Sequence, residues 1–234
     1  MTIFDKAIEF AVKAHSGMTR KGKLTPYITH PIEVASIPAT FTDDVEVLAA
    51  AVLHDTVEDT PYTYHDICSS FGKRIADLVM SDSEDKQEHR PASETWKARK
   101  QQTLDYLANA TQEEKIVAFS DKLSNLRAIH RDYLTIWEAL WERFNQKDPM
   151  EHLWYYGSFL EICKEFSDTP AYREYTKLFG EIESRVIEYR DYGSHGSHLK
   201  VIATPGDNAW ILQDDTNGEL IRLSQEDFNR LYQV

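Results

Sequence analysis

Apolar and polar residues alternate along most of this chain with the period of an amphipathic helix. Between Phe4 and His15, apolar side chains recur three and four residues apart, which places them on one face of a helix. Similar periods continue to about residue 190. Thr42 or Asp43 is the predicted cap of the helix that contains residues 47–59, and Thr63 with Asp66 and Thr111 with Glu114 are predicted capping boxes. We therefore predict a mainly all-α fold, a helical bundle. The predicted helices cover residues 4–15, 32–40, 47–59, 64–71, 73–79, 94–108, 112–130, 134–144, 149–166 and 170–189.

The pattern changes after residue 190. Residues 191–198 read DYGSHGSH, in which Gly, Ser and His replace helix formers, and they are predicted to form a linker. The last segment, 199–234, alternates like strands around a predicted hairpin turn at 216–218 and ends in a short polar helix at 225–232. We expect a helical domain, then the linker, then a small β-hairpin appendage. Three roles for this appendage stay open: it closes the active site, contacts another copy of the chain, or binds a partner.

One stretch combines buried and charged character. An apolar run from Val47 to Leu53 ends in four charged or ligating residues, His54, Asp55, Glu58 and Asp59. On a helix, residues three and four apart share a face, so one imidazole and three carboxylates crowd its end. Burying so many acids without a partner is very costly, and a divalent cation is the simplest partner. The alternative is a solvent-exposed helix turn with ordinary surface acids.

Charge narrows the classes of ligand. The chain has 26 basic and 39 acidic residues, a net charge of −13, which argues against broad binding to the phosphate backbone of nucleic acid. A small phosphorylated ligand, held by a metal and a few basic residues, is compatible with this charge. Arg20, Lys21 and Lys23 cluster in one polar loop and are candidates for that contact.

The remaining composition points to a soluble cytoplasmic protein. Cys68 and Cys163 are far apart and lack the spacing of metal ligands, so we interpret them as buried thiols in a reducing compartment. The N-terminal helix carries charges unlike those of a signal peptide. No apolar run reaches the ~18 residues of a membrane span, so no membrane partner is expected.

Four candidate ligands occur at helix ends or beside core segments: His30, the adjacent pair His54 and Asp55, and Asp121. Two histidines and two carboxylates suit Mn²⁺, Fe²⁺ or Zn²⁺ better than Ca²⁺. The adjacent His-Asp pair, with a distant His before it and a distant Asp after it, resembles the HD-domain phosphohydrolase superfamily. Three stretches point to a more specific family. They resemble three motifs of RelA/SpoT-type alarmone hydrolases and read RKGKLTPYITHP, LHDTVEDT and FSDKLSNLRAI. The resemblance covers about residues 1–165 and indicates the small alarmone hydrolase type, without a synthetase region.

This resemblance implies a set of site residues. Glu58 and Asp59 match the pair that handles the attacking water in the family. Asn125, like Arg20 and Lys21, matches a position that contacts the nucleotide and its phosphates. The metal, typically Mn²⁺ although another divalent transition metal is compatible, would be bound by His30, His54, Asp55 and Asp121.

Two further substrate contacts are predicted. Lys86 falls in the segment SEDK, where the family has residues near the ligand, although the details of that segment differ in this chain. Tyr155 belongs to an aromatic run that is mostly expected in the core, and it is our choice for lining the base pocket.

The family reaction removes the 3′-pyrophosphate of ppGpp or pppGpp and leaves GDP or GTP. A metal lowers the pKa of its water ligand towards neutrality, and Glu58, one turn from His54, is placed to take the proton. Two alternatives remain: an HD phosphohydrolase for another nucleotide, such as a nucleotide 5′-phosphatase or NADPH phosphatase, and a non-catalytic alarmone-sensing module. The presence of Glu58 and Asp59 favours an enzyme, and the basic loop favours an alarmone. Whether the chain forms a homo-oligomer is left open.

Overall fold

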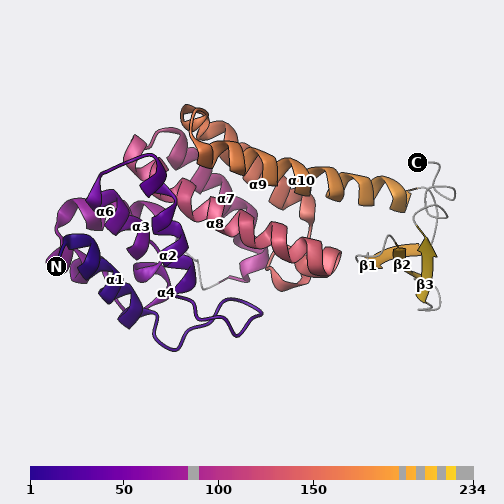
Figure 1. Ribbon diagram of the computed structural model, residues 1–234, viewed down its shortest axis with the longest axis horizontal. Helices are drawn as coiled ribbons and strands as arrows, with labels where there is room; N and C mark the ends of the chain where they lie inside the picture. Colours follow the sequence, from indigo (N-terminus) through magenta and orange to yellow (C-terminus); the bar gives the residue numbers. More distant parts are fainter. Residues whose placement is uncertain (84–89, 195–198, 204–208, 215–219, 225–234) are drawn as a thin grey trace.

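The computed structural model describes residues 1–83, 90–194, 199–203, 209–214 and 220–224. It confirms the prediction of a mainly all-α fold (Figure 1). The α-helices are α1 Ile3–Ala14, α2 Thr29–Ser36, α3 Val45–Leu53, α4 Thr56–Asp59, α5 Tyr64–Phe71, α6 Lys73–Asp82, α7 Ala92–Ala108, α8 Gln112–Ile136, α9 Pro149–Ile162 and α10 Pro170–Ser194. Short 3₁₀ helices are η1 Pro38–Thr40, η2 Trp137–Arg143 and η3 Lys164–Phe166, and the strands are β1 Leu199–Ala203, β2 Ala209–Asp214 and β3 Leu220–Ser224.

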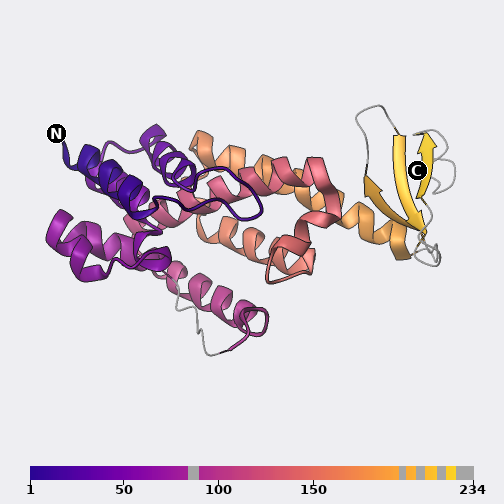
Figure 2. The same ribbon diagram turned by 90° about the horizontal axis from the view of Figure 1, so that it is seen from below.

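Helix α3 lies at the centre of the N-terminal half, where it contacts α1, α2, α6 and α8 (Figures 1 and 2). The run of alanines favours a helix and lets the neighbouring helices approach closely. Residues 49–53 are all fully buried. The helix is capped by Asp44, whose carboxylate accepts hydrogen bonds from the backbone N–H groups of Glu46 and Val47. The cap was predicted one or two residues earlier, at Thr42 or Asp43; Thr42 instead accepts a hydrogen bond from the Asp44 N–H group.

The predicted helix 47–59 is interrupted. Helix α3 ends at Leu53, and the single turn α4 begins at Thr56. Between them the backbone stays in the right-handed region, but ψ at Asp55 is −2°, which breaks the regular ladder of hydrogen bonds. The Asp59 N–H group still bonds to the Asp55 carbonyl at 2.9 Å, so His54 and Glu58 stay about one turn apart.

Several other helix boundaries differ from the predicted ones, most clearly those of α2 and α8. Helix α2 begins at Thr29, so His30 lies in its first turn, and it ends at Ser36 because Pro38 cannot continue the backbone ladder. Helix α8 runs on to Ile136, where Trp137 adopts a φ of +49° and the chain turns into η2. The predicted helix 134–144 is therefore the end of α8 followed by a 3₁₀ segment.

The C-terminal part starts later than composition suggests. Helix α10 continues to Ser194, four residues into the predicted linker, because a long helix tolerates its two glycines, Gly180 and Gly193, at a cost of about 1 kcal/mol each. Strands β1, β2 and β3 pair in that order in an antiparallel sheet. The predicted turn at 216–218 and the predicted helix at 225–232 lie outside the described residues. In the described part of the chain, no helix has the length and apolarity needed to cross a membrane.

Candidate active site

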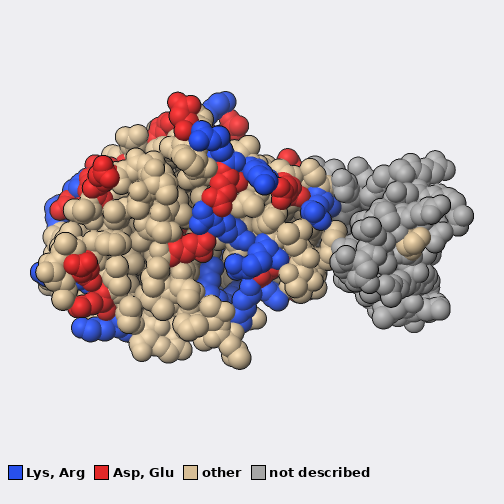
Figure 3. All heavy atoms as spheres, viewed as in Figure 1, with Lys and Arg blue, Asp and Glu red and all other residues tan. Residues whose placement is uncertain are grey.

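A cavity of about 780 Å³ opens where the loop before α2 faces helices α7, α8 and α9. The segment around His54 and the end of α6 close it on the other side. Figure 3 shows Lys and Arg side chains gathered around a hollow on this face of the molecule. The size is that of a small-molecule site.

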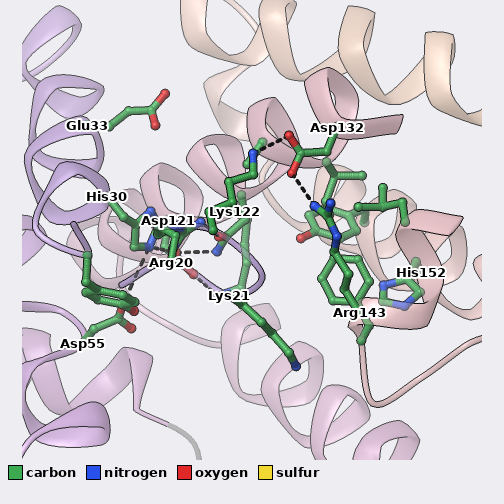
Figure 4. A pocket seen from close by; sticks show the side chains of 18 of the residues that line it. Arg20, Lys21, His30, Glu33, Asp55, Asp121, Lys122, Asp132, Arg143 and His152 are labelled. Atoms are coloured by element: carbon green, nitrogen blue, oxygen red, sulfur yellow. Dashed lines mark hydrogen bonds and ion pairs between the residues drawn. The ribbon is translucent and has the colours of Figure 1, made fainter. Parts of the chain in front are cut away.

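Three of the four predicted metal ligands, His30, Asp55 and Asp121, line one end of this cavity (Figure 4), and the fourth, His54, lies against them. His30 Nε2 lies 3.0 Å from Asp121 Oδ1 and 3.5 Å from Asp55 Oδ2. His54 Nε2 lies 2.9 Å from Asp55 Oδ2 and 3.5 Å from Asp121 Oδ1. One ligand atom from each of His30, His54 and Asp121 lies within 4.8 Å of the other two, and all three residues are buried.

The partners of the Nδ1 atoms fix the orientation of both imidazoles. His54 Nδ1 lies 2.9 Å from the Ala51 carbonyl, which can only accept, so Nδ1 carries the proton. His30 Nδ1 lies 2.9 Å from the Ser124 hydroxyl, which donates its own proton to Glu33 and therefore accepts from His30. In their neutral forms, both rings thus direct an Nε2 lone pair at carboxylate oxygens. Lone pairs facing each other in a buried site require a shared proton or a cation between them.

In the absence of a metal, protons are shared between the imidazoles and the carboxylates. Burial opposes the charged form of His54, but Asp55 and Asp121 raise its pKa well above the usual value. Burial also opposes the charge of the two carboxylates, yet the pKa of Asp55 is held well below its usual range by His54, and that of Asp121 by Lys122 and the histidines. The donor set of imidazole nitrogens and carboxylate oxygens fits Mn²⁺, Fe²⁺ or Zn²⁺, and a cation would replace the proton.

Tyr27 connects the carboxylates behind this cluster. Its hydroxyl lies 2.5 Å from Asp55 Oδ2 and 3.0 Å from Asp59 Oδ2. Burial, together with the charges of Asp55 and Asp59, raises the pKa of Tyr27, so the hydroxyl keeps its proton and donates it. Glu58 lines the cavity, whereas Asp59 is not among the lining residues. The buried imidazole of His15 packs on the Tyr27 ring, with 4.9 Å between ring centroids.

A second set of contacts surrounds Asp121. Lys122 Nζ lies 2.5 Å from Asp121 Oδ2, and Asn125 Nδ2 donates to Asp121 Oδ1 at 2.6 Å. The Arg20 guanidinium donates in turn to Asn125 Oδ1 at 3.1 Å (Figure 4). Lys122 also lies 3.7 Å from the buried Asp82 carboxylate. Although burial opposes its charge, these two carboxylates raise the pKa of Lys122 well above the usual value.

The predicted substrate residues Arg20, Lys21, Asn125 and Tyr155 all line the cavity, and Tyr155 is buried with Lys100 Nζ 5.0 Å from its ring centroid. Lys86 lies outside the described residues. Eight basic residues line the cavity against six carboxylates, in a chain that is acidic as a whole. The basic residues are Arg20, Lys21, Lys23, Arg99, Lys100, Lys122, Arg131 and Arg143.

Sequence reasoning missed several of these side chains. Tyr27 lies in the motif TPYITHP, three residues before His30, but nothing in the spacing indicates that its hydroxyl reaches Asp55. Glu33 lies in α2 about one turn after His30, and only the fold brings Ser124 to it. Lys122 follows Asp121 directly, but nothing in the spacing indicates that its side chain is buried beside Asp121 and Asp82.

Comparison with known proteins supports the family predicted from the sequence motifs. Residues 7–143 match the HD domain family. The chain is 37% identical over 137 residues to a zebrafish (Danio rerio) protein named guanosine-3′,5′-bis(diphosphate) 3′-pyrophosphohydrolase MESH1, covering 57% of this chain and 73% of the relative. The human protein of the same name is 40% identical over 130 residues, covering 54% and 69%. The bifunctional (p)ppGpp synthase/hydrolase SpoT of Escherichia coli is 54% identical over 66 residues, which are 28% of this chain and 9% of SpoT.

Two solved structures share the fold. The crystal structure of lmo0812 from Listeria monocytogenes is 29% identical, with a TM-score of 0.58, and the match covers 71% of this chain and 99% of that one. A metazoan ortholog of SpoT, described as hydrolysing ppGpp, is 25% identical, with a TM-score of 0.60 and coverage of 77% and 96%. The family predicted from the three motifs is thereby confirmed. The chain belongs to the HD domain family and is similar to the MESH1 pyrophosphohydrolases.

Proposed function

We propose that this chain is a metal-dependent hydrolase that removes the 3′-pyrophosphate of ppGpp or pppGpp and leaves GDP or GTP. The observation that carries the proposal is the pair of imidazoles that direct Nε2 at two carboxylates, at the end of a cavity lined by eight basic residues. Such a site suits a cation and a polyanionic substrate together. The names of the MESH1 and SpoT relatives supply the substrate.

In this proposal, His30, His54, Asp55 and Asp121 bind the metal, with Mn²⁺ as the expected ion. A divalent metal held there supplies Lewis acidity and lowers the pKa of a water molecule towards neutrality. Ser124 and Ala51 hold the two imidazoles with Nε2 towards the ion.

Glu58 is the proposed general base, because its carboxylate lines the cavity about one turn after His54. It accepts the proton of the attacking water as the new P–O bond forms. The bond from that phosphorus to the ribose 3′-oxygen breaks, the 3′-oxygen takes a proton from solvent to become the hydroxyl of GDP or GTP, and pyrophosphate is released. For Asp59 we propose a positioning role, through Tyr27, in place of the predicted direct contact with water. Its carboxylate accepts from the hydroxyl that also holds Asp55.

Charge on the phosphoryl oxygens rises as the water attacks, and nearby cations stabilise it. Arg20 and Lys21 are proposed for this task, with Asn125 orienting the Arg20 guanidinium through its side-chain oxygen. Tyr155 is proposed to line the nucleoside part of the cavity, beside Lys100.

The direct test is to incubate the purified protein and Mn²⁺ with ppGpp, GTP, dAMP and NADPH in separate reactions and to identify the products. We expect GDP and pyrophosphate from ppGpp. Glu58→Gln should keep its Mn²⁺ affinity, measured by calorimetry, while kcat falls by ~10²–10⁴, the usual contribution of acid–base catalysis.

Glu161→Gln serves as the matched control, because Glu161 is exposed on α9 and its carboxylate lies 3.6 Å from Lys164 on the surface. It should behave like the unchanged protein. Turnover of dAMP or NADPH but not of ppGpp would assign the chain to another class of HD phosphohydrolase. Binding of ppGpp without turnover of any substrate would favour the sensing module.

A further inference from the structure

A buried carboxylate to which the proposed mechanism gives no task lies at the end of helix α6. Asp82 is the last residue of this helix, and its side chain is 5% exposed. It lines the cavity together with Asp121 and Lys122. The carboxyl end of a helix carries a partial negative charge, so both burial and the helix oppose the charge of Asp82. A carboxylate in this place lowers the stability of the fold unless a cation compensates it.

Lys122 supplies that cation and shares it between two carboxylates. Its Nζ lies 3.7 Å from Asp82 Oδ1 and 2.5 Å from Asp121 Oδ2. None of the three side chains is more than 10% exposed, so solvent screens these contacts only weakly. Burial raises the pKa of Asp82 to about 6, and the charge of Lys122 limits the rise. The Asp82 carboxylate is therefore mostly charged at pH 7.

The contact with Lys122 orients Asp121. Lys122 holds Oδ2 of Asp121, which leaves Oδ1 towards the imidazoles, 3.0 Å from His30 Nε2 (Figure 4). The same lysine places a positive charge beside a site proposed for a dication. Like charges repel strongly in a buried site, because little water screens them. An acid on the far side of Lys122 offsets that repulsion, and Asp82 is in this position.

Asp82 also completes the balance of charge at the metal end. The four proposed ligands carry two negative charges when both imidazoles are neutral. Lys122 cancels one of these charges, and Asp82 restores it. The ligands and this ion pair then match the two charges of a divalent cation, which lowers the cost of burying them together. One contact further out, Arg20 and Asp59 add one charge of each sign.

We propose that Asp82 is a positioning residue of the metal site and that it acts through Lys122. It neutralises the lysine that holds Asp121, so that this ligand is oriented without repulsion of the cation. Asp82 thereby sets the affinity for the metal and does not touch the substrate. The assignment rests on the proposed function in one respect, that a divalent metal binds there, and it requires no particular substrate.

Calorimetry with Mn²⁺ tests this role in the full chain. Asp82→Asn removes the charge at nearly constant volume, and we expect the Mn²⁺ affinity to fall by about 10- to 100-fold, the usual range for residues that support metal ligands. In the Lys122→Met background, the same substitution should change the affinity by less than about threefold, because no lysine remains to be neutralised. Equal losses in both backgrounds would overturn the proposal, since a residue that only ends α6 would act with or without Lys122.

Asp77→Asn is the matched control. Asp77 lies on the same helix and also pairs with a lysine, Lys73 at 2.5 Å, but this pair is exposed on the surface. Its Mn²⁺ affinity should stay that of the unchanged protein. If circular dichroism shows that Lys122→Met is unfolded, Asp82→Glu carries the comparison. It keeps the charge, so its affinity should stay within about threefold of the unchanged protein, and a loss as large as that of Asp82→Asn would contradict the proposed role.

Turnover of ppGpp separates this inference from the proposed function. In Asp82→Asn, the Mn²⁺ concentration that gives half the maximal rate should rise with the dissociation constant, while kcat at saturating Mn²⁺ stays within about threefold. A protein that shows the coupled Mn²⁺ affinities but does not hydrolyse ppGpp would refute the proposed substrate and leave the role of Asp82 standing. Hydrolysis of ppGpp with an undiminished Mn²⁺ affinity in Asp82→Asn would overturn the role of Asp82 alone. Absence of Mn²⁺ binding by the unchanged protein would refute both.

Discussion

Each imidazole of the candidate metal site has its Nδ1 proton committed to an oxygen atom, the Ala51 carbonyl for His54 and the Ser124 hydroxyl for His30. These contacts decide which nitrogen faces the carboxylates. The His-Asp pair and its distant partners could be found from the sequence because the ligands belong to recognisable motifs. Ser124 and Glu33 could not, because their contact joins α8 to α2 and depends on the packing of the two helices.

Replacing Tyr27 with Phe tests how Asp55 is held. Removal of the hydroxyl leaves Asp55 and Asp59 without their shared donor, so the Asp55 carboxylate loses its fixed orientation towards the ion. We expect the Mn²⁺ affinity measured by calorimetry to fall by about 10-fold, within the usual range for residues that support metal ligands. Asp59→Asn should weaken binding less than additively when it is combined with Tyr27→Phe, because both changes act on one network.

Tyr64→Phe is the matched control for this measurement. Tyr64 also donates to a carboxylate, Asp77 at 2.8 Å, but that pair joins α5 to α6 outside the metal cluster. Its Mn²⁺ affinity should stay that of the unchanged protein. Equal affinities for the Tyr27 and Tyr64 variants would show that the Tyr27 hydroxyl plays no part in holding Asp55.

Among the elements, α8 brings the most chemistry to the cavity. Asp121, Lys122 and Asn125 line the cavity near His30, and Asp132 lies further along the same helix, where it accepts from Lys23 and Arg143. The helix starts at a capping box that the sequence predicts, in which Thr111 Oγ1 accepts from the Glu114 N–H group and the Glu114 carboxylate accepts from the Thr111 N–H group. Its polar residues Ser120, Asp121, Lys122 and Ser124 are buried because α2, α3, α6 and α10 pack around it.

Thr111→Ala removes the N-cap of α8. We expect the free energy of unfolding, measured by urea denaturation, to fall by ~1 kcal/mol, the typical cost of losing a threonine cap. The kinetic constants should stay unchanged, because the cap lies at the opposite end of a long helix from Asp132 and two to three turns from Asp121.

Thr176→Ala provides the comparison. The Thr176 hydroxyl donates only to the Tyr172 carbonyl within α10, and its removal should change stability by less than about 0.5 kcal/mol. If both threonine variants are equally stable, the capping box contributes nothing measurable to α8.

The whole molecule combines a net charge of −13 with a basic cavity. That contrast concentrates positive potential in the cavity, as expected of a site for the proposed polyanionic substrate. Stacked aromatic rings pack helices α8, α9 and α10 against one another. The ring centroid of Phe119 in α8 lies 5.4 Å from that of Tyr175 in α10 and 6.4 Å from that of Phe159 in α9. Tyr175 and Phe159 are fully buried.

Two truncations test where the folded unit ends. The chain ending at Ser194 retains Tyr175 and every proposed site residue, so we expect it to bind Mn²⁺ with unchanged affinity and to hydrolyse ppGpp. The chain ending at Thr169 lacks Tyr175 and exposes Phe119 and Phe159, and its melting temperature should fall steeply or its folding be lost. If the chain that ends at Ser194 does not fold, residues 195–234 are part of the domain, and the proposed division of the chain is refuted.

The sequence by itself determined the helical class, the capping boxes at Thr63 and Thr111, and the motifs that identify the family, because these depend on local periods and short spacings. The break at His54 and Asp55 and the length of α8 were decided by tertiary structure, since packing overrides local propensity at helix ends. Only the fold brings Tyr27 to Asp55, Ser124 to His30, and Lys23 and Arg143 to Asp132. Each of these contacts joins residues from separate segments, and their relative positions follow from how the buried faces of the helices pack.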